Sequence, residues 1–360
     1  MGAELSYLRP VECAPNGRAV SLRYHAPEFR EICELALTVL SGADPLFNGE
    51  VSSAEAAGDM LFSVDLCMSD QATAEATQDQ HVRSTCAMPL HGIIKARSDS
   101  LNVQIVSVEP PQLPDAQIEA ANMNMHIADS GFMRMLRQAV EAGFCQGRRR
   151  ICFIEAAKAD AASPSWVNFA SRRLTEIFSE LDIASMSPAD AAAAMASDQF
   201  RHDIVIAEPA SAEIFRTLAV TLTGTEGFAV TSAFTPEGLN VTPLASSGER
   251  RADAGSAPIL QGLAAGIEAL VALKRYAAAG TVHNAILRTL EDGVHPSSVR
   301  HIAPYSTKVS DAEFVDAVIE RFGDRRRNHE PVDYAGYRQG KEGGVGTRSP
   351  LRLVHSRDTL

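Results

Sequence analysis

The sequence predicts an α/β fold, in which helices cover the faces of a sheet that contains parallel strands. The first observation is a continuous apolar run at 203–207, which is typical of a strand buried on both faces. The second is the segment after that run: the chain turns at Pro209 and continues with apolar residues at helical spacing. The third is that the same order, strand and then helix, recurs along the chain.

Each element is predicted from its own local pattern. Strands are predicted at 19–22, 151–157 and 203–207, where apolar residues run together. Helices are predicted where apolar residues recur every three or four positions, at 28–40, 129–146, 166–179, 259–279 and 281–292. In the helix after Pro209 the predicted apolar face comprises Ile214, Phe215, Leu218 and Ala219. A last helix begins near Ser310 or Asp311, either of which is a suitable N-cap.

Composition excludes several classes of protein. With 360 residues, 45% of them hydrophobic and 22% charged, the chain is long enough for a large core. A net charge of -12 argues against nucleic acid as the main partner, because phosphate binding needs concentrated Lys and Arg. The six cysteines are scattered without C-x-x-C spacing, which favours reduced thiols over disulfides or zinc. No apolar run is long enough to span a bilayer, and no secretory signal is visible.

The segment 201–227 resembles a signature of the isocitrate/isopropylmalate dehydrogenase family, F-D-V-I-V-x-P-N-L-Y-G-D-I-L-S-D followed by a G-G-L-G turn. Its apolar strand matches, and Gly224 and Gly227 match the glycines. In the family the two aspartates of G-D-I-L-S-D hold a divalent metal. These aspartates fall on Glu213 and Thr217, so the resemblance implies at most half of that metal site.

Two further stretches resemble the family's substrate-binding and catalytic motifs. The stretch 83–103 is similar to G-L-K-G-P-L-x-T-P-I-x-x-G-x-x-S-x-N-L-x-L-R, which places Ser100 and Asn102 on residues that touch the substrate carboxylates. The arginine that closes this motif falls on Val106. Downstream, 158–160 lies on K-A-N, so the resemblance places Lys158 on the catalytic lysine.

The cofactor loop and a second metal position come from the same resemblance. The segment 254–258 resembles H-G-S-A-P, the adenine-nucleotide loop, and its matching residues are Gly255, Ser256, Ala257 and Pro258. The histidine of that loop is replaced by Ala254. With one deletion allowed, Asp190 falls on the aspartate that the family contributes to a neighbouring subunit's metal site; without the deletion Ala189 falls there.

The resemblance implies a fold with a mixed sheet flanked by helices and two domains that share a cleft. A large domain would be built from 19–107 and 226–323, and a small dimerisation domain, 108–225, would be inserted between them. Residues 1–18 and 324–360 have no counterpart and are expected to form extended arms.

The family's reaction requires an arginine clamp on a dicarboxylate, Mg²⁺ or Mn²⁺ on aspartates, and a lysine and a tyrosine that move protons. By the resemblance, the arginines, the tyrosine and the glycine-rich turn, which becomes 24–29, are absent. We therefore expect a catalytically inactive protein without a cofactor, a structural or regulatory subunit of a complex in the mitochondrial matrix. It would be a homodimer or would pair with an active paralogue. The alternatives are an active NAD(P)- and metal-dependent dehydrogenase of a malate-type 2-hydroxy acid, and a nucleotide-sensing module.

Overall fold

A computed structural model of the chain describes residues 20–24, 29–45, 47, 49–53, 62–67, 82–87, 97–98, 100–109, 131–155, 166–225, 228–234, 238–244, 259–296, 299, 305–327 and 330–334. Two of the predicted site segments, Lys158 and 255–258, lie outside these residues.

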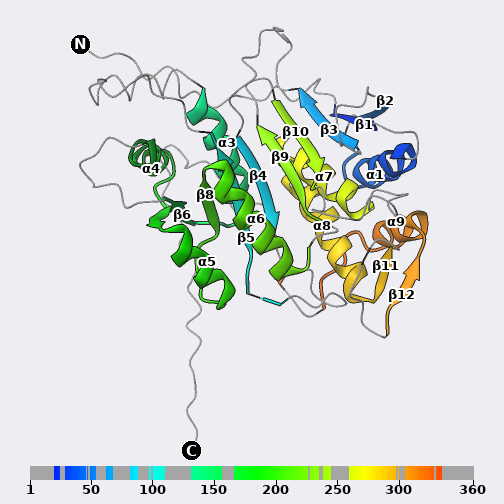
Figure 1. Cartoon of the computed structure of the whole chain (residues 1–360). Coiled ribbons are helices and arrows are strands. Elements are labelled where there is room, and N and C mark those ends of the chain that lie inside the picture. The colour runs from blue at the N-terminus through cyan, green and yellow to red at the C-terminus, as the bar shows by residue number, and fades with distance from the viewer. Residues whose placement is uncertain are drawn as a thin grey trace, which may run out of the picture.

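A sheet of ten strands forms the centre of the described structure, in the order β2-β1-β3-β10-β9-β4-β5-β8-β6-β7 (Figure 1). Its strands are β1 (Val20–Tyr24), β2 (Gly49–Ser53), β3 (Phe62–Cys67), β4 (Val82–Ala87), β5 (Val103–Val108), β6 (Arg150–Ile154), β7 (Asp182–Met186), β8 (Ile204–Ala207), β9 (Val230–Phe234) and β10 (Gly238–Pro243). The pairs β5·β8, β8·β6 and β6·β7 are parallel, whereas β3, β10, β9, β4 and β5 pair antiparallel. The sheet is therefore mixed, as predicted.

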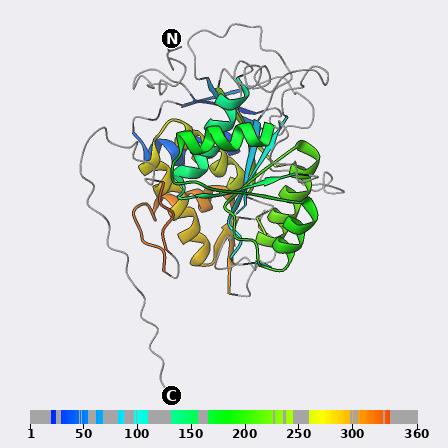
Figure 2. The same ribbon diagram turned by 90° about the vertical axis from the view of Figure 1, so that its left-hand side faces the viewer.

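Helices cover both faces of this sheet, which is visible when it is viewed edge-on (Figure 2). They are α1 (Arg30–Ala43), α3 (Phe132–Cys145), α4 (Trp166–Ile177), α5 (Pro188–Ala196), α6 (Pro209–Thr223), α7 (Ile259–Ala272), α8 (Tyr276–Glu291) and α9 (Asp311–Ile319). Buried residues of α1, α3, α4, α7, α8 and α9 join one core cluster, and those of α5 and α6 join a second. A separate pair, β11 (Val294–Pro296) and β12 (Thr307–Val309), lies beside α8 and α9.

Strand burial explains why the sequence patterns were informative. Every residue of β8 is buried, because α6 covers one face and α3 and its neighbours cover the other. Along β8 the side chains alternate between the clusters: Ile204 and Ile206 join the first, and Val205 and Ala207 join the second. A continuous apolar run is what such a two-sided strand requires.

Two details of the predicted helices are wrong. Ile214 was placed on the apolar face of α6, but it is 63% exposed, whereas Phe215 is buried. The helix predicted to run to residue 279 ends at Ala272, because Lys274 takes a left-handed φ of 60° and the amide of Arg275 returns to the carbonyl of Leu270. The next helix consequently begins earlier than predicted.

The last helix begins as its sequence indicates. Ser310 caps α9, and its hydroxyl accepts a hydrogen bond from the amide of Glu313 while the Glu313 side chain accepts one from the amide of Ser310. Strands β6, β7 and β8, which belong to 108–225, are neighbours at one end of the sheet. The proposed domain boundaries stay a prediction. Among the described helices, none combines the length and the apolar character needed to cross a membrane.

Candidate functional site

The parallel strands β5, β8, β6 and β7 present two edges, and the predicted site residues divide between them. We call the side where these strands begin the amino edge and the side where they end the carboxyl edge. Ser100 and Asn102 directly precede β5 at the amino edge. Glu213, in the helix after β8, and Asp190, in the helix after β7, lie toward the carboxyl edge. The structure therefore does not bring these two groups together in one site.

At the carboxyl edge both carboxylates have partners on their own helix. Glu213, whose side chain is 57% exposed, forms an ion pair with Arg216 one turn along α6. Asp190 accepts a hydrogen bond of 2.7 Å from Ser187, whose hydroxyl caps α5 by accepting from the amide of Asp190 at 3.2 Å. Within the described part of the chain, no three His, Cys, Asp or Glu residues are grouped so that they could hold a metal ion.

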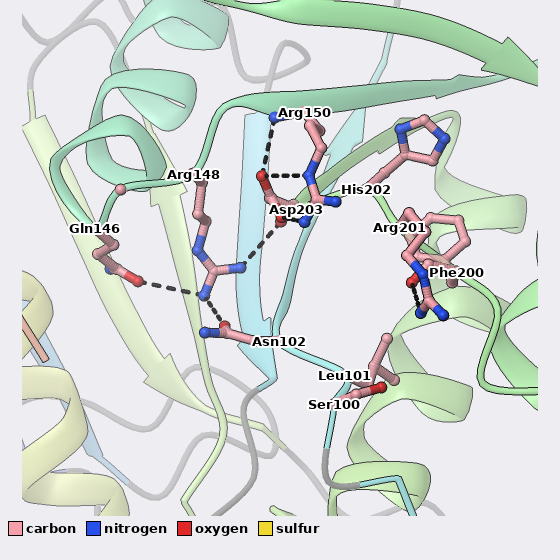
Figure 3. A pocket seen from close by; sticks show the side chains of 11 residues that line it. Ser100, Leu101, Asn102, Gln146, Arg148, Arg150, Phe200, Arg201, His202 and Asp203 are labelled. Atoms are coloured by element: carbon pink, nitrogen blue, oxygen red, sulfur yellow. Dashed lines mark hydrogen bonds and ion pairs between the residues drawn. The ribbon is translucent and has the colours of Figure 1, made fainter. Parts of the chain in front are cut away.

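At the amino edge a concave pocket of about 260 Å³ lies where β5, β6 and β8 begin (Figure 3). Its lining comes from three segments that are far apart in the sequence, namely Ser100–Asn102, Gln146–Arg148 with Arg150, and Phe200–Asp203. Most of the lining side chains are polar or charged. The pocket is thus built by the sheet, which places the three strand beginnings side by side.

The end of α3 places Arg148 in this pocket. Gly147 takes a left-handed φ of 80°, a conformation that suits glycine. The amide of Gly147 bonds to the carbonyl of Phe144 at 3.0 Å, and the amide of Arg148 bonds to that of Gly143 at 3.2 Å. This pair of bonds is the Schellman motif that ends many helices. It turns the chain from α3 directly into the arginines that precede β6.

Asp203 fixes the start of β6 against the start of β8. Its carboxylate accepts the backbone amides of Arg149 and Arg150, each at 3.0 Å, and the Arg150 guanidinium at 2.6 and 3.2 Å. Burial alone would raise the pKa of Asp203. The donors from Arg150 and the two amides outweigh it and hold the pKa below its ordinary value. The charge of Arg150 is therefore matched within the pocket.

Arg148, in contrast to Arg150, is bonded only to neutral acceptors among the described residues. The side chain is buried, with the residue 4% exposed, and it donates to Asn102 Oδ1 at 2.8 Å, the Asp203 carbonyl at 3.0 Å and Gln146 Oε1 at 3.3 Å. All three acceptors are neutral. Its Nε has no hydrogen-bond partner among the described residues. A buried guanidinium is thus held in place by amide and carbonyl oxygens, without a directly bonded carboxylate in the described structure.

The segment before β8 adds two more nitrogen-bearing side chains. Arg201 donates to the backbone carbonyls of Asp198 and Phe200, at 3.0 and 3.4 Å. The ring of His202 packs edge-on against Phe200, and its Nδ1 is buried without a partner in the described part of the chain. Burial and then the Arg150 guanidinium lower the pKa of His202.

Ser100 and Asn102 have structural partners at this edge. The hydroxyl of Ser100 donates to Asp198 at 2.6 Å, beside that of Ser98 at the same distance. These hydrogen bonds, first that of Ser100, lower the pKa of Asp198. Asn102 accepts from Arg148. Both residues therefore organise the rim of the pocket, and their predicted contact with a substrate carboxylate stays a prediction.

A second group of polar side chains lies behind the pocket, between the sheet and α7. Burial raises the pKa of Glu268 to about 7, against the opposing effect of Arg148. Burial also raises the pKa of Cys86, on β4, to about 12. Deeper in the fold, burial lowers the pKa of His283 to about 3, and its Nδ1 lies 2.7 Å from the hydroxyl of Tyr334. Arg148 thus lies between the pocket and the partly buried carboxyl group of Glu268.

Comparison with known proteins bears on the fold. No protein-family model matches the chain, and no curated protein matches its sequence. Solved structures do match. A protein from Thermus thermophilus is similar over 89% of this chain and 72% of its own, with a TM-score of 0.56 and 15% identity. Isocitrate dehydrogenase from Methylococcus capsulatus is similar over 84% of this chain and 98% of its own, with a TM-score of 0.53 and 14% identity.

The chain has an isocitrate dehydrogenase-like fold. This confirms the fold that the resemblance predicted, including the mixed sheet flanked by helices. Of the residues that line the amino-edge pocket, Ser100 and Asn102 were predicted as substrate-binding residues, whereas the three arginines, His202 and Asp203 were not predicted as part of a site. A signal was nevertheless present, because three consecutive arginines, 148–150, directly precede a buried strand. Cationic side chains at the start of an apolar strand have to be accommodated at its edge.

Proposed function

We propose that this chain is a non-catalytic protein built on the isocitrate dehydrogenase-like fold, acting as a structural or regulatory subunit of a protein complex. One observation carries the proposal: the described counterparts of the family's site residues are bonded to other side chains of this chain and are divided between two edges of the sheet. Glu213 pairs with Arg216, Asp190 with Ser187, and Ser100 with Asp198.

Catalysis in such a site requires its parts to converge on one substrate. A metal needs two or three carboxylate oxygens directed at one point, and the substrate carboxylates need arginine forks within reach of the same point. On α6, Glu213 stands alone in this role, since the second signature position is Thr217. Parts that act as a unit lose orders of magnitude in rate when one member is removed. The dispersed arrangement favours a scaffold over an enzyme.

The proposal extends to partners and location. The chain forms a homodimer, or a heterodimer with an active paralogue, within a larger mitochondrial assembly, and it works without a bound dinucleotide or metal. These points rest on the likeness of the fold to isocitrate dehydrogenase and on the overall acidity of the chain, which disfavours nucleic acid as a partner.

Two measurements test the proposal together. The purified chain is incubated with NAD or NADP, Mg²⁺ or Mn²⁺, and isocitrate, isopropylmalate, malate or tartrate, and reduced nucleotide is followed at its absorbance band. We expect none above the protein-free control. The chain is then isolated from its source under native conditions, and we expect it to elute with a stoichiometric protein partner. Nucleotide reduction would establish the alternative, an active dehydrogenase of a malate-type 2-hydroxy acid, and elution as a free monomer would contradict the subunit role.

A further inference from the structure

We propose that the pocket at the amino edge binds a small phosphate-type oxyanion. The pocket lies where β5, β6 and β8 begin, at the opposite edge of these strands from Glu213, which lies near the start of α6 and falls on the family's metal signature. Two of its lining residues, Ser100 and Asn102, fall by the resemblance on substrate-binding positions, whereas its three arginines were not among the predicted site residues.

The charge of the lining is the first argument. Three arginines, Arg148, Arg150 and Arg201, line the pocket together with a single carboxylate, Asp203. That carboxylate is taken by Arg150 and by two backbone amides. The lining therefore carries a net positive charge, although the chain as a whole carries -12. A concave surface of one sign focuses the field on a ligand of the opposite sign.

The second argument is the state of Arg148. A buried charge is costly unless it is paired, and the described acceptors around Arg148 are all neutral oxygens. Its Nε is buried and has no partner in the described residues. His202 presents a second buried nitrogen, Nδ1, in the same condition. The described acidic group that interacts electrostatically with Arg148 without bonding to it is Glu268, whose pKa burial raises to about 7. An anion in the pocket would supply a counter-charge in direct contact with the guanidinium.

Size and shape then select the ligand. A volume of about 260 Å³ exceeds the roughly 150 Å³ of a cavity that holds benzene but lies below the roughly 300 Å³ at which pockets for drug-sized ligands begin. One arginine fork satisfies a carboxylate, whereas a phosphate offers oxygens in several directions. Arg148 and Arg201 line the pocket from different segments, before β6 and before β8, and lie apart from each other in it (Figure 3). A tetrahedral dianion suits that arrangement better than a planar carboxylate.

The test is calorimetric titration of the full chain with inorganic phosphate, repeated with glycerol 3-phosphate and with succinate. We expect one phosphate per chain. The variant Arg201→Gln should weaken binding by about tenfold or more, since it removes a charge-assisted contact. Arg148→Gln should weaken it further. The matched control is Arg30→Gln, an exposed arginine of α1 that pairs with Glu34 at the other end of the sheet, and it should change the affinity less than about twofold.

Each outcome decides the matter. Tighter binding of glycerol 3-phosphate than of phosphate identifies an esterified phosphate as the ligand, and the reverse order identifies free phosphate. The proposal is overturned if phosphate does not bind the wild-type chain. It is also overturned if phosphate binds Arg201→Gln and Arg148→Gln as tightly as it binds the control, Arg30→Gln. If succinate binds more tightly than phosphate, and this binding is lost in Arg201→Gln, the ligand is a carboxylate and the proposal of a phosphate is overturned. If Arg148→Gln proves too unstable to purify, Arg201→Gln still decides, because Arg201 is exposed and donates only to backbone carbonyls in the described structure.

Discussion

The two edges of the parallel strands differ in how their charged side chains are held. At the carboxyl edge, the two predicted metal positions that the structure describes have partners on or at the cap of their own helix: Glu213 pairs with Arg216, and Asp190 accepts from Ser187. At the amino edge, Arg148 joins residues from two other segments, Asn102 and Asp203, which lie 46 and 55 positions away. The first arrangement is local and solvated, and the second is tertiary and buried. The buried arginine, Arg148, therefore lies at the opposite edge from Glu213, the position that falls on the family's metal signature.

The largest effect should come from removing the cation that joins those segments. Arg148→Met removes a buried side chain and leaves the oxygens of Asn102, Gln146 and the Asp203 carbonyl without their donor in a partly buried setting. We expect the free energy of unfolding to fall by about 3 kcal/mol, measured by urea denaturation. Arg30→Met, which removes an exposed arginine, is the control and should change it by less than about 0.5 kcal/mol. Equal losses in the two variants would show that the amino edge is no more tightly coupled than the surface.

A smaller, pH-dependent effect should appear behind the same edge. In the folded state the pKa of Glu268 is raised from 4.5 to about 7. Between pH 4.5 and pH 7, the folded state therefore holds a proton that the unfolded state has released. Stability from this group is thus fully present below pH 4.5 and is lost as the pH rises through 7. Glu268→Gln should remove this dependence, which amounts to about 1–2 kcal/mol because the side chain is only partly buried.

The measurement is the difference in unfolding free energy between the wild-type chain and Glu268→Gln at pH 5 and pH 8. Taking this difference cancels the contribution of His283, whose low pKa acts in the opposite direction and costs stability as the pH falls below 6.5. A difference that stays constant between the two pH values would mean that Glu268 titrates normally. Glu268 would then contribute no pH dependence to the stability of the fold behind the amino edge.

The contrast between the edges also explains what the sequence could predict. The fold was predictable because β8 and its neighbours are buried on both faces, so a run of apolar residues at 203–207 indicates them directly. The cap Ser310 was predictable for a different reason, which is that its partner, Glu313, is only three residues away in the sequence. Features whose partners are close in the sequence leave a pattern that can be recognised.

The pocket left no such pattern. Its lining requires that Asn102, Arg148 and Asp203 meet, and only the parallel pairing of β5, β8 and β6 brings them together. The exposure of Ile214 could not be predicted either, because helical spacing does not show which positions of the helix other elements cover. Lys158 and the loop 255–258 lie outside the described residues, so their roles stay predictions.

The smallest effect should be at the signature position itself. Glu213→Gln removes an ion pair between side chains that are 57% and 25% exposed, and such pairs within a helix contribute about 0.3–0.5 kcal/mol. We expect a change of that size in urea denaturation, diminishing in high salt because exposed charges are screened. Mg²⁺ or Mn²⁺ should leave the melting temperatures of the wild-type chain and of this variant equally unchanged. A metal-dependent rise in the wild-type melting temperature that Glu213→Gln abolishes would instead place a working metal site at the carboxyl edge, since only a ligand bound to the folded state can produce it.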